Sequence, residues 1–402
     1  MKRLLMRAIL TAFVMTLTVH GAAMAGQQPR RPVIRSGVEL LVVDVQVVDR
    51  QGRPILTLGP DDFDVTIDRK PRRVASAQLV RHTTADITQA AKPSAPRDMV
   101  PVTAKDGRRF ILAIDEHSFR PASAPAAMHA ATRFIDQLQP NDLVGLYTYP
   151  TGAVHSDLTN DHAAVRTLLG RVTGLLDVPA GRYGISKSEA IDIASGVRET
   201  LAHVVRRECG RAEPLCSQSI EQDSISFAAY FEMQVSQSLA GLRHLFSGLK
   251  KLEGRKTLVI VSGGLFTSDS ATGRAKMAGD IRAVGLEAAA SNTNLYVLHM
   301  DSSFLDAFSE RRGPSQTLFR DSGQMAAGLE VLADAGGGAL IRVEAGTGDG
   351  AFGRVLRENS AYYLLGVEPD PADRDGGAHT VQVRVRGRGL TVRSRKQVVV
   401  PK

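Results

Sequence analysis

The chain has 402 residues, of which 43% are hydrophobic, and a formal net charge of +8 at pH 7. This length and apolar content are enough for two or three domain cores at roughly 100–200 residues per domain. Basic residues are interleaved with acidic ones, which excludes the clustered basic stripe typical of nucleic-acid-binding proteins.

The first 25 residues have the organisation of a secretory signal peptide. Three basic residues within 1–7 precede an apolar stretch at 8–19 that is too short to span a bilayer. Ala23 and Ala25 then form the A-x-A pattern of a cleavage site, which an uncleaved membrane anchor does not need. Cleavage after Ala25 lowers the formal charge from +8 to +5, because the three basic residues are removed. We expect a secreted or periplasmic mature protein without a transmembrane segment.

A β-rich region follows the signal peptide. Residues 26–36 are polar and contain prolines, as is typical of a flexible leader. The segment 37–82 is rich in β-branched residues and turn signals, so it is interpreted as an N-terminal β domain. Its expected strands are 38–48, 54–58, 61–68 and 73–80.

The middle of the chain alternates strand and helix patterns. Residues 83–107 are poor in large apolar side chains and are interpreted as a linker. The alternation in 108–305 predicts an α/β fold with a doubly wound, mostly parallel, Rossmann-like sheet. The expected strands are 110–115, 142–149, 257–262 and 294–301, and the expected helices are 124–137, 161–172, 186–208, 220–252 and 275–292.

The end of the chain returns to strand patterns. A connecting helix region at 306–340 contains a helical pattern at 322–335 that stops at three glycines. The segment 341–402 is interpreted as a C-terminal β segment, with strands at 361–369, 379–387 and 390–400. We expect the N-terminal and C-terminal β segments to form a β-sandwich-like unit.

The chain has two cysteines, Cys209 and Cys216. Export to an oxidising compartment favours a disulfide between them over two free thiols. A metal site would need more ligands, and His203 is the only other candidate in this segment.

Several motifs occur in order along the mature chain. They are VVDRQGRPILTLGPDDFDVTIDRKPRRV at 47–74, FILAID at 110–115, KTLVIVSGGLF at 256–266, LYVLHMD at 295–301, LADAGGG at 332–338 and ENSAYYLLGVEPD at 358–370. Together they resemble the von Willebrand factor A-related domain proteins of the acidobacterial type. The resemblance covers most of the mature chain. It implies a Rossmann-like domain with a metal-ion-dependent adhesion site at the carboxyl ends of its strands.

In that family site, an Asp and two Ser in D-x-S-x-S, a Thr and a second Asp hold Mg²⁺ or Ca²⁺ through oxygen atoms. Here Asp115 occupies the first position, but residues 116–119 place neither serine in register. Ser118 lies nearby, Ser186 stands in for the Thr, and Ser262 replaces the second Asp. These four residues form a degenerate candidate site, with Asp115 as the candidate metal ligand. The alternative is that Asp115 caps a helix or pairs with a base, and we expect no resident cofactor.

Two other motifs suggest chemistry. GRYGISKS at 181–188 is one glycine short of a phosphate-binding loop, and a capping box formed by Ser186 and Glu189 explains the same letters. His117 lies beside Asp115, which admits a hydrolase that uses both residues. The sequence contains no G-x-S-x-G and no H-E-x-x-H motif.

These features predict an exported, non-enzymatic, adhesion-type protein that recognises a protein or cell-envelope ligand and no nucleic acid. Two alternatives stay open. One is the exported hydrolase that uses Asp115 and His117. The other is an envelope scaffold whose long helices within 186–252 self-associate.

Overall fold

The computed structural model describes residues 40–82, 102–103, 107–177, 181–210, 215–252, 254–266, 276–291, 293–301, 317–343 and 348–401. The expected signal peptide (1–25) and leader (26–36), and most of the expected linker, lie outside these residues. Among the described helices, none combines the length and apolarity that crossing a membrane requires.

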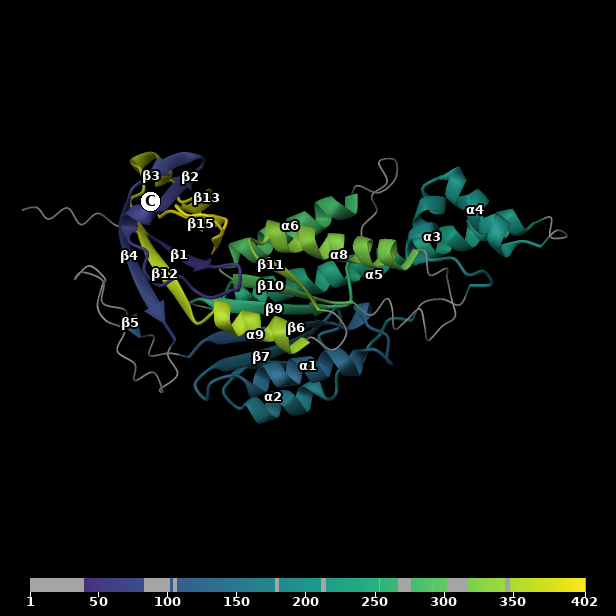
Figure 1. Cartoon of the computed structure of the whole chain (residues 1–402), viewed down its shortest axis with the longest axis horizontal. Coiled ribbons are helices and arrows are strands. Elements are labelled where there is room, and N and C mark those ends of the chain that lie inside the picture. Colours follow the sequence, from purple (N-terminus) through teal and green to yellow (C-terminus); the bar gives the residue numbers. More distant parts are fainter. Residues whose placement is uncertain are drawn as a thin grey trace, which may run out of the picture. The chain divides into compact units, whose positions relative to one another are not determined.

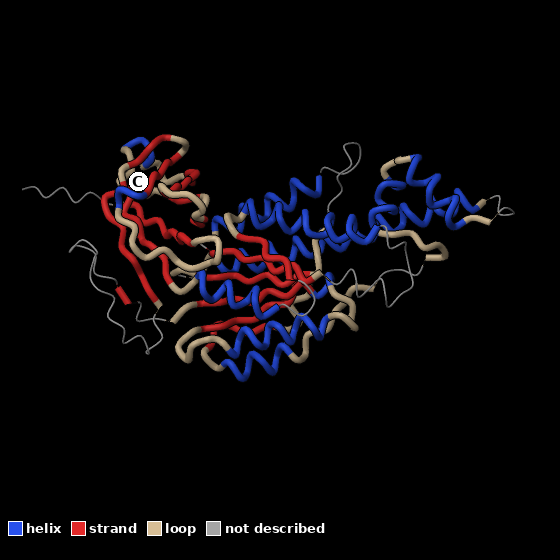
Figure 2. The backbone as a smooth tube through the Cα atoms, viewed as in Figure 1, coloured by secondary structure: helices blue, strands red, loops and turns tan. Residues whose placement is uncertain are grey.

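A six-stranded, mostly parallel sheet forms the α/β part, with strand order β11-β10-β9-β6-β7-β8 (Figures 1 and 2). Its strands are β6 (Arg109–Asp115), β7 (Leu143–Tyr149), β8 (His155–Thr159), β9 (Lys256–Ser262), β10 (Thr293–Met300) and β11 (Ala339–Val343). All neighbours pair in parallel except β7 and β8, which are antiparallel. The expected α/β class with a mostly parallel sheet is confirmed.

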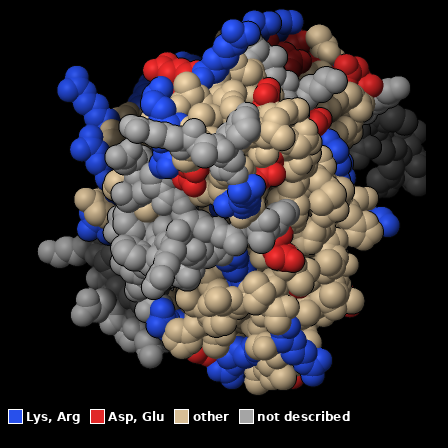
Figure 3. Space-filling model, turned by 90° about the vertical axis from the view of Figure 1, so that its right-hand side faces the viewer, with Lys and Arg blue, Asp and Glu red and all other residues tan. Residues whose placement is uncertain are grey.

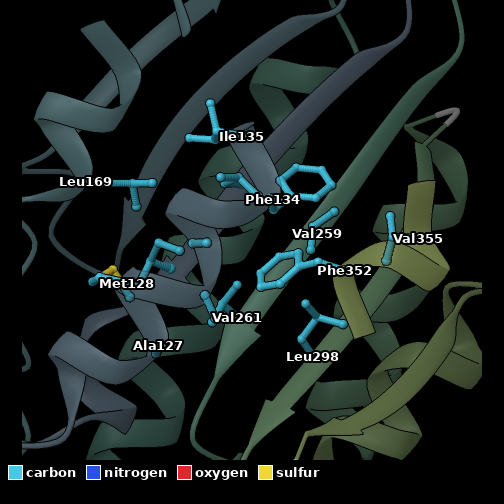
Figure 4. Close-up of a cluster of buried hydrophobic side chains, with 14 of the residues drawn as sticks. Ala127, Met128, Phe134, Ile135, Leu169, Val259, Val261, Leu298, Phe352 and Val355 are labelled. Atoms are coloured by element: carbon cyan, nitrogen blue, oxygen red, sulfur yellow. The ribbon is translucent and has the colours of Figure 1, made fainter. Parts of the chain in front are cut away.

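Helices cover both faces of this sheet, which explains the continuous apolar runs of β6 and β9. One face packs against α1 (Ala124–Asp136), α2 (His162–Leu169) and α9 (Gly348–Glu358). Figure 4 shows this cluster, in which the ring of Phe134 lies 5.4 Å from that of Phe110 and 5.0 Å from that of Phe352. The other face packs against α5 (Cys216–Leu249), α6 (Lys276–Ala290) and α8 (Leu318–Ala335).

The α/β part extends beyond the limit expected at residue 305. Strand β11 continues the sheet beside β10, and α9 packs against α1. The segment 341–402, interpreted as a C-terminal β segment, therefore also contains the helix α9. Arg342 interrupts the short apolar run of β11, and the glycines at the start of α9 are typical of a loop, so neither element was predicted. Strand β8 was missed because its sequence, HSDLT, has one large apolar residue.

Two further sheets contain the chain's N-terminal and C-terminal strands. Their orders are β14-β1-β12-β4-β5 and β15-β13-β2-β3. The strands are β1 (Leu41–Val48), β2 (Phe63–Ile67), β3 (Lys70–Arg72), β4 (Val74–Arg81), β5 (Val102–Thr103), β12 (Ala361–Val367), β13 (Ala378–Val385), β14 (Thr391–Ser394) and β15 (Gln397–Val399). One apolar cluster, which includes Val45, Phe63 and Val383, is shared by both sheets. The terminal segments thus form one β unit. The strand expected at 54–58 is absent, since only Pro54 pairs, through an isolated bridge to Val48.

A buried polar cluster joins this β unit to the α/β part at Glu358, the last residue of α9. Its carboxylate accepts hydrogen bonds from Tyr296 Oη (2.9 Å), Arg393 Nε (3.0 Å) and Arg354 Nε (2.7 Å). The Glu358 side chain is fully buried. Burial by itself raises the pKa of Glu358, but Arg393 and the hydrogen bonds outweigh burial and lower it. The charge is therefore retained inside the protein by three donors from separate elements.

Helices α3 (Lys187–Ala194), α4 (Arg198–Glu208) and the first half of α5 pack on one another, and we call them the helical arm. The single helix expected over 186–208 is divided by Gly196, whose φ of +86° a helix cannot continue through. The expected disulfide is confirmed: Cys209 and Cys216 are bonded, with their Cα atoms 5.9 Å apart. It links the end of α4 to the start of α5.

Loss of this disulfide is expected to lower the free energy of unfolding by about 2–3 kcal/mol, because a loop of this length loses that much closure entropy in the unfolded chain. Urea denaturation of the Cys209→Ala/Cys216→Ala variant provides the measurement. The reduced wild-type protein is the control and should match the variant. Equal unfolding midpoints for the variant and the oxidised wild type would contradict the prediction.

Candidate binding site at the carboxyl ends of the strands

Asp115 lies at the centre of a buried polar cluster at the carboxyl ends of the parallel strands. It ends β6, and Ser262 ends the neighbouring strand β9. The Oγ of Ser262 donates a hydrogen bond to Asp115 Oδ2 (3.0 Å), and the Oγ of Ser238 on α5 donates one to Asp115 Oδ1 (3.0 Å). All three residues are buried. Both carboxylate oxygens are therefore bound by serine hydroxyls of the same chain.

The environment of Asp115 raises its pKa to about 7. Burial is the main cause, because it penalises the charged form. The hydrogen bonds from Ser262, Ser238 and the backbone of His117 act in the opposite direction, while the charge of Glu116 raises the pKa further. Asp115 therefore changes its protonation state near neutral pH.

Ser118 belongs to the same cluster and connects two loops. Its Oγ donates to the backbone oxygen of Asp115 (2.8 Å) and accepts from the backbone nitrogen of Gly263 (2.7 Å). The hydroxyl thus ties the loop after β6 to the loop after β9.

Ser186 has a different position and role. It is the N-cap of α3, where its Oγ accepts from the backbone nitrogen of Glu189 (3.3 Å) and its own backbone nitrogen donates to Glu189 Oε2 (3.0 Å). Sequence analysis gave this capping box as the alternative to a phosphate-binding loop at 181–188, and the structure has the capping box. The structure brings Asp115, Ser118 and Ser262 together and places Ser186 at the start of a helix.

His117 and Asp115 do not form a side-chain pair. The Asp115 carboxylate oxygens accept from Ser238 and Ser262, and His117 contributes its backbone N–H. The buried Nδ1 of His117 has no hydrogen-bond partner among the described residues. Burial lowers the pKa of His117, against smaller opposing effects of the neighbouring Gln234 and Glu116 side chains. The geometry that a general base oriented by Asp115 would need is therefore not assembled.

The residues present do not fit a resident divalent cation. Ca²⁺ takes six to eight oxygen ligands and Mg²⁺ takes six, supplied by carboxylates, other protein oxygens and waters. Among the described residues, Asp115 is the only carboxylate that lines the adjoining cavity of about 30 Å³, and Lys187 lines it as well. No group of three His, Cys, Asp or Glu side chains suited to a metal occurs in the part of the chain that the structure describes.

A much larger groove, of about 850 Å³, begins beside this cluster and lies between α5 and the β7–β8 pair. His117 and the loop at 150–152 line it at the strand ends, and Leu252 lines it beyond the end of α5. Its apolar side chains include Ile111, Leu158, Leu245, Leu249 and Leu252. Sequence patterns did not reveal this groove, because its two walls come from segments about a hundred residues apart.

Two glycines shape the groove. Gly145 adds no side chain to the part of β7 that lines it. Gly241 allows α5 to approach the end of β7 closely, because a Cβ there would lie 2.8 Å from the backbone of Pro150 and from Cβ of Tyr149.

The outer surface seen in Figure 3 carries side chains of both charge signs, interspersed with uncharged ones.

Comparisons with known proteins give no family assignment. No family model matches the chain, and no curated protein matches it. Among solved structures, the chain is similar to the pilus adhesin SpaC from Lactobacillus rhamnosus GG in its open conformation, with 7% identity and a TM-score of 0.34 over 85% of this chain and 48% of that one. It is also similar to the human COPII-coat protein Sec24c, with 11% identity and a TM-score of 0.27 over 74% of this chain and 44% of that one. The chain thus spans about half the length of each.

Proposed function

We propose that this chain is an exported, non-enzymatic binding protein with a von Willebrand factor A-like α/β domain that recognises a protein or cell-envelope ligand. The observation that carries the proposal is the groove of about 850 Å³ between α5 and the β7–β8 pair, which opens beside the carboxyl ends of β6 and β7. Open α/β sheets bind ligands at this end of their strands. The predominantly apolar lining, with a few polar groups at its margin, is typical of a recognition site.

The buried cluster supports binding over hydrolysis. The Asp115 carboxylate is held by Ser238 and Ser262, so it neither orients His117 nor reaches a substrate in the groove. Among the described residues that line the adjoining cavity, Asp115 is the one carboxylate, and Lys187 lines it as well. We therefore propose that ligand binding does not depend on Mg²⁺ or Ca²⁺. Export and cleavage after Ala25, and self-association through the helical arm, stay predictions.

The test uses two tryptophan variants on one helix. Ala240 lies in the groove wall, whereas Ala229 is exposed on α5 outside the groove. Immobilised protein captures ligands from cell-envelope extracts, with Mg²⁺ or with EDTA. We expect wild type and Ala229→Trp to retain the same partner in both buffers, and Ala240→Trp to retain at least about tenfold less.

Other outcomes would contradict the proposal. Equal capture by Ala240→Trp would place binding elsewhere. Capture that EDTA abolishes and Mg²⁺ restores would show a metal-dependent site. Substrate turnover that both Asp115→Ala and His117→Ala abolish, with the fold intact, would favour the hydrolase.

A further inference from the structure

We propose that His379 is the centre of a pH-dependent clasp in the β unit. Its protonated ring fixes the loop at 374–377 to the turn at 68–69 between β2 and β3, and its neutral ring releases that loop. The clasp consists of His379, Asp68 and Asp375, in the sheet β15-β13-β2-β3 (Figure 1). It does not depend on the proposed binding function.

Both ring nitrogens of His379 face carboxylates. Nδ1 lies 2.8 Å from Asp68 Oδ2, and Nε2 lies 3.0 Å from Asp375 Oδ1. A neutral imidazole has one N–H and one lone pair, whereas an ionised carboxylate can only accept hydrogen bonds. Both contacts can therefore be hydrogen bonds at the same time only when the ring is an imidazolium, which donates from both nitrogens. The observed arrangement is that of protonated His379.

Hydrogen bonds lower the pKa of both carboxyl groups of the clasp. Those from His379 and from the backbone of Thr380 lower the pKa of Asp68, and those from the backbone of Gly377 and from His379 lower the pKa of Asp375. The hydrogen bonds to Asp68 and Asp375 in turn raise the pKa of His379 above its ordinary value of 6.5. The ring is therefore protonated in the closed clasp at pH 6.5, and it becomes neutral as the pH rises through the elevated value.

The other charged groups near the ring do not replace its proton. Asp373 and Arg72 form their own ion pair at 2.6 Å, with both side chains nearly buried. The charge of Asp373 acts in the same direction as the two clasp carboxylates, because it also interacts favourably with protonated His379. Strand β15, which pairs with β13 at His379, is uncharged over Gln397–Val399. The remaining charged side chains of the turn and of the loop with its preceding 3-10 helix are more exposed: Arg69, Lys70, Asp370 and Arg374.

The neutral ring can keep one of its two hydrogen bonds, and the surrounding bonds favour the one to Asp68. The backbone N–H of Thr380 donates to Asp68 Oδ1 at 2.9 Å, and the N–H of Asp68 donates to the backbone oxygen of Thr380 at 2.9 Å. The carboxylate of Asp375 instead accepts from the N–H of Gly377, within its own loop, and its side chain is 61% exposed. Repulsion between a ring lone pair and a carboxylate is therefore relieved by movement of Asp375 into solvent. The neutral ring then carries its proton on Nδ1.

The loop can move without unfolding the strand beside it. Gly376 has a φ of +79°, and its N–H donates to the backbone oxygen of Val400 at 3.1 Å. Val398 and Val400 are buried in the apolar cluster of the β unit. Because this burial retains β15, release of the clasp breaks the bond between Gly376 and Val400 and leaves the sheet paired.

The first test titrates His379 in the full-length protein. NMR of protein labelled with ¹⁵N-histidine reports the protonation state and the tautomer of each ring, and His379→Gln assigns the signal. We expect a pKa above 6.5 and an Nδ1–H tautomer at high pH. Asp68→Asn and Asp375→Asn should each lower this pKa, because each removes a carboxylate that favours the imidazolium. Asp64→Asn, which removes an exposed carboxylate from the same strand, should not change it.

The second test measures release of the loop by amide hydrogen exchange. We expect the protection factor of the Gly376 N–H to fall at least about threefold between pH 6 and pH 9, because loss of the proton is linked to opening. Local opening of a loop is detected before global unfolding. Asp375→Asn should reduce this pH dependence, and Asp64→Asn should retain it.

Three results would overturn the proposal. The first is a His379 pKa at or below 6.5, or one that neither Asn variant of the clasp lowers. The second is a wild-type protection factor at Gly376 that stays constant from pH 6 to pH 9, which indicates a static ion pair. The third is an Nε2–H tautomer at high pH, which shows that the loop keeps its bond and the turn is released instead.

Discussion

Replacing Asp115 by Asn is expected to stabilise the protein at pH 8 and to remove a decline in stability between about pH 4 and pH 7. Burial raises the pKa of Asp115 from 3.8 to about 7 in the folded state. Between these values the folded state keeps a proton that the unfolded state has lost, so the free energy of unfolding falls as pH rises. The stabilising effect of the protonated carboxyl is complete below about pH 4 and is lost as pH passes through 7.

The shift corresponds to on the order of 4 kcal/mol, because each pKa unit is worth about 1.4 kcal/mol. Asparagine stays neutral at every pH and can use the same two serines, since a hydroxyl donates and accepts hydrogen bonds. Urea denaturation at pH 5 and pH 8 measures the difference for wild type and variant. Asp157→Asn, at an exposed position, removes the same formal charge and is the control. Parallel pH profiles for wild type and Asp115→Asn would contradict the prediction.

Glu358→Ala is expected to destabilise the protein by about 3–5 kcal/mol, because it leaves buried Arg393 without the carboxylate that compensates its charge. The side chain of Arg393 is 9% exposed, and Tyr296 loses its acceptor as well. Denaturant-induced unfolding measures the loss. Glu358→Gln should cost less than Ala, since the amide oxygen still accepts a hydrogen bond.

Glu368→Ala provides a matched control for this effect. Glu368 pairs with Arg73 at 3.0 Å, a distance similar to that of the Glu358–Arg393 pair, but the Arg73 side chain is 76% exposed. An exposed pair of this kind contributes at most about 1 kcal/mol. If both alanine variants lose the same free energy of unfolding, burial does not explain the stabilising effect of the Glu358 cluster.

Much of the local structure followed from sequence patterns. The strands expected at 110–115 and 257–262 differ from β6 and β9 by one residue each, because a buried parallel strand reads as a continuous apolar run. The capping box of Ser186 and Glu189 correctly indicated a helix start. The break at Gly196 was missed, because a glycine inside a helical pattern does not by itself show whether the helix ends there.

The candidate site was predicted only in part. Asp115 and Ser262 end neighbouring strands and Ser118 follows the first of them, so their proximity could be expected from the parallel sheet. Ser238 could not be found in this way. It is one of several serines on a long helix, and nothing in its own segment distinguishes the one that reaches Asp115.

The sequence alone determined the alternation of strands and helices, the residues that end β6 and β9, and the cysteines that form the disulfide. These features depend on neighbours within a few residues, where periodicity, capping and covalent chemistry act. The tertiary structure decided which serines hold Asp115, how β12 lies between β1 and β4, and where α5 leaves a groove beside β7 and β8. These features depend on the packing of segments a hundred or more residues apart, and no local pattern records which side chains meet there.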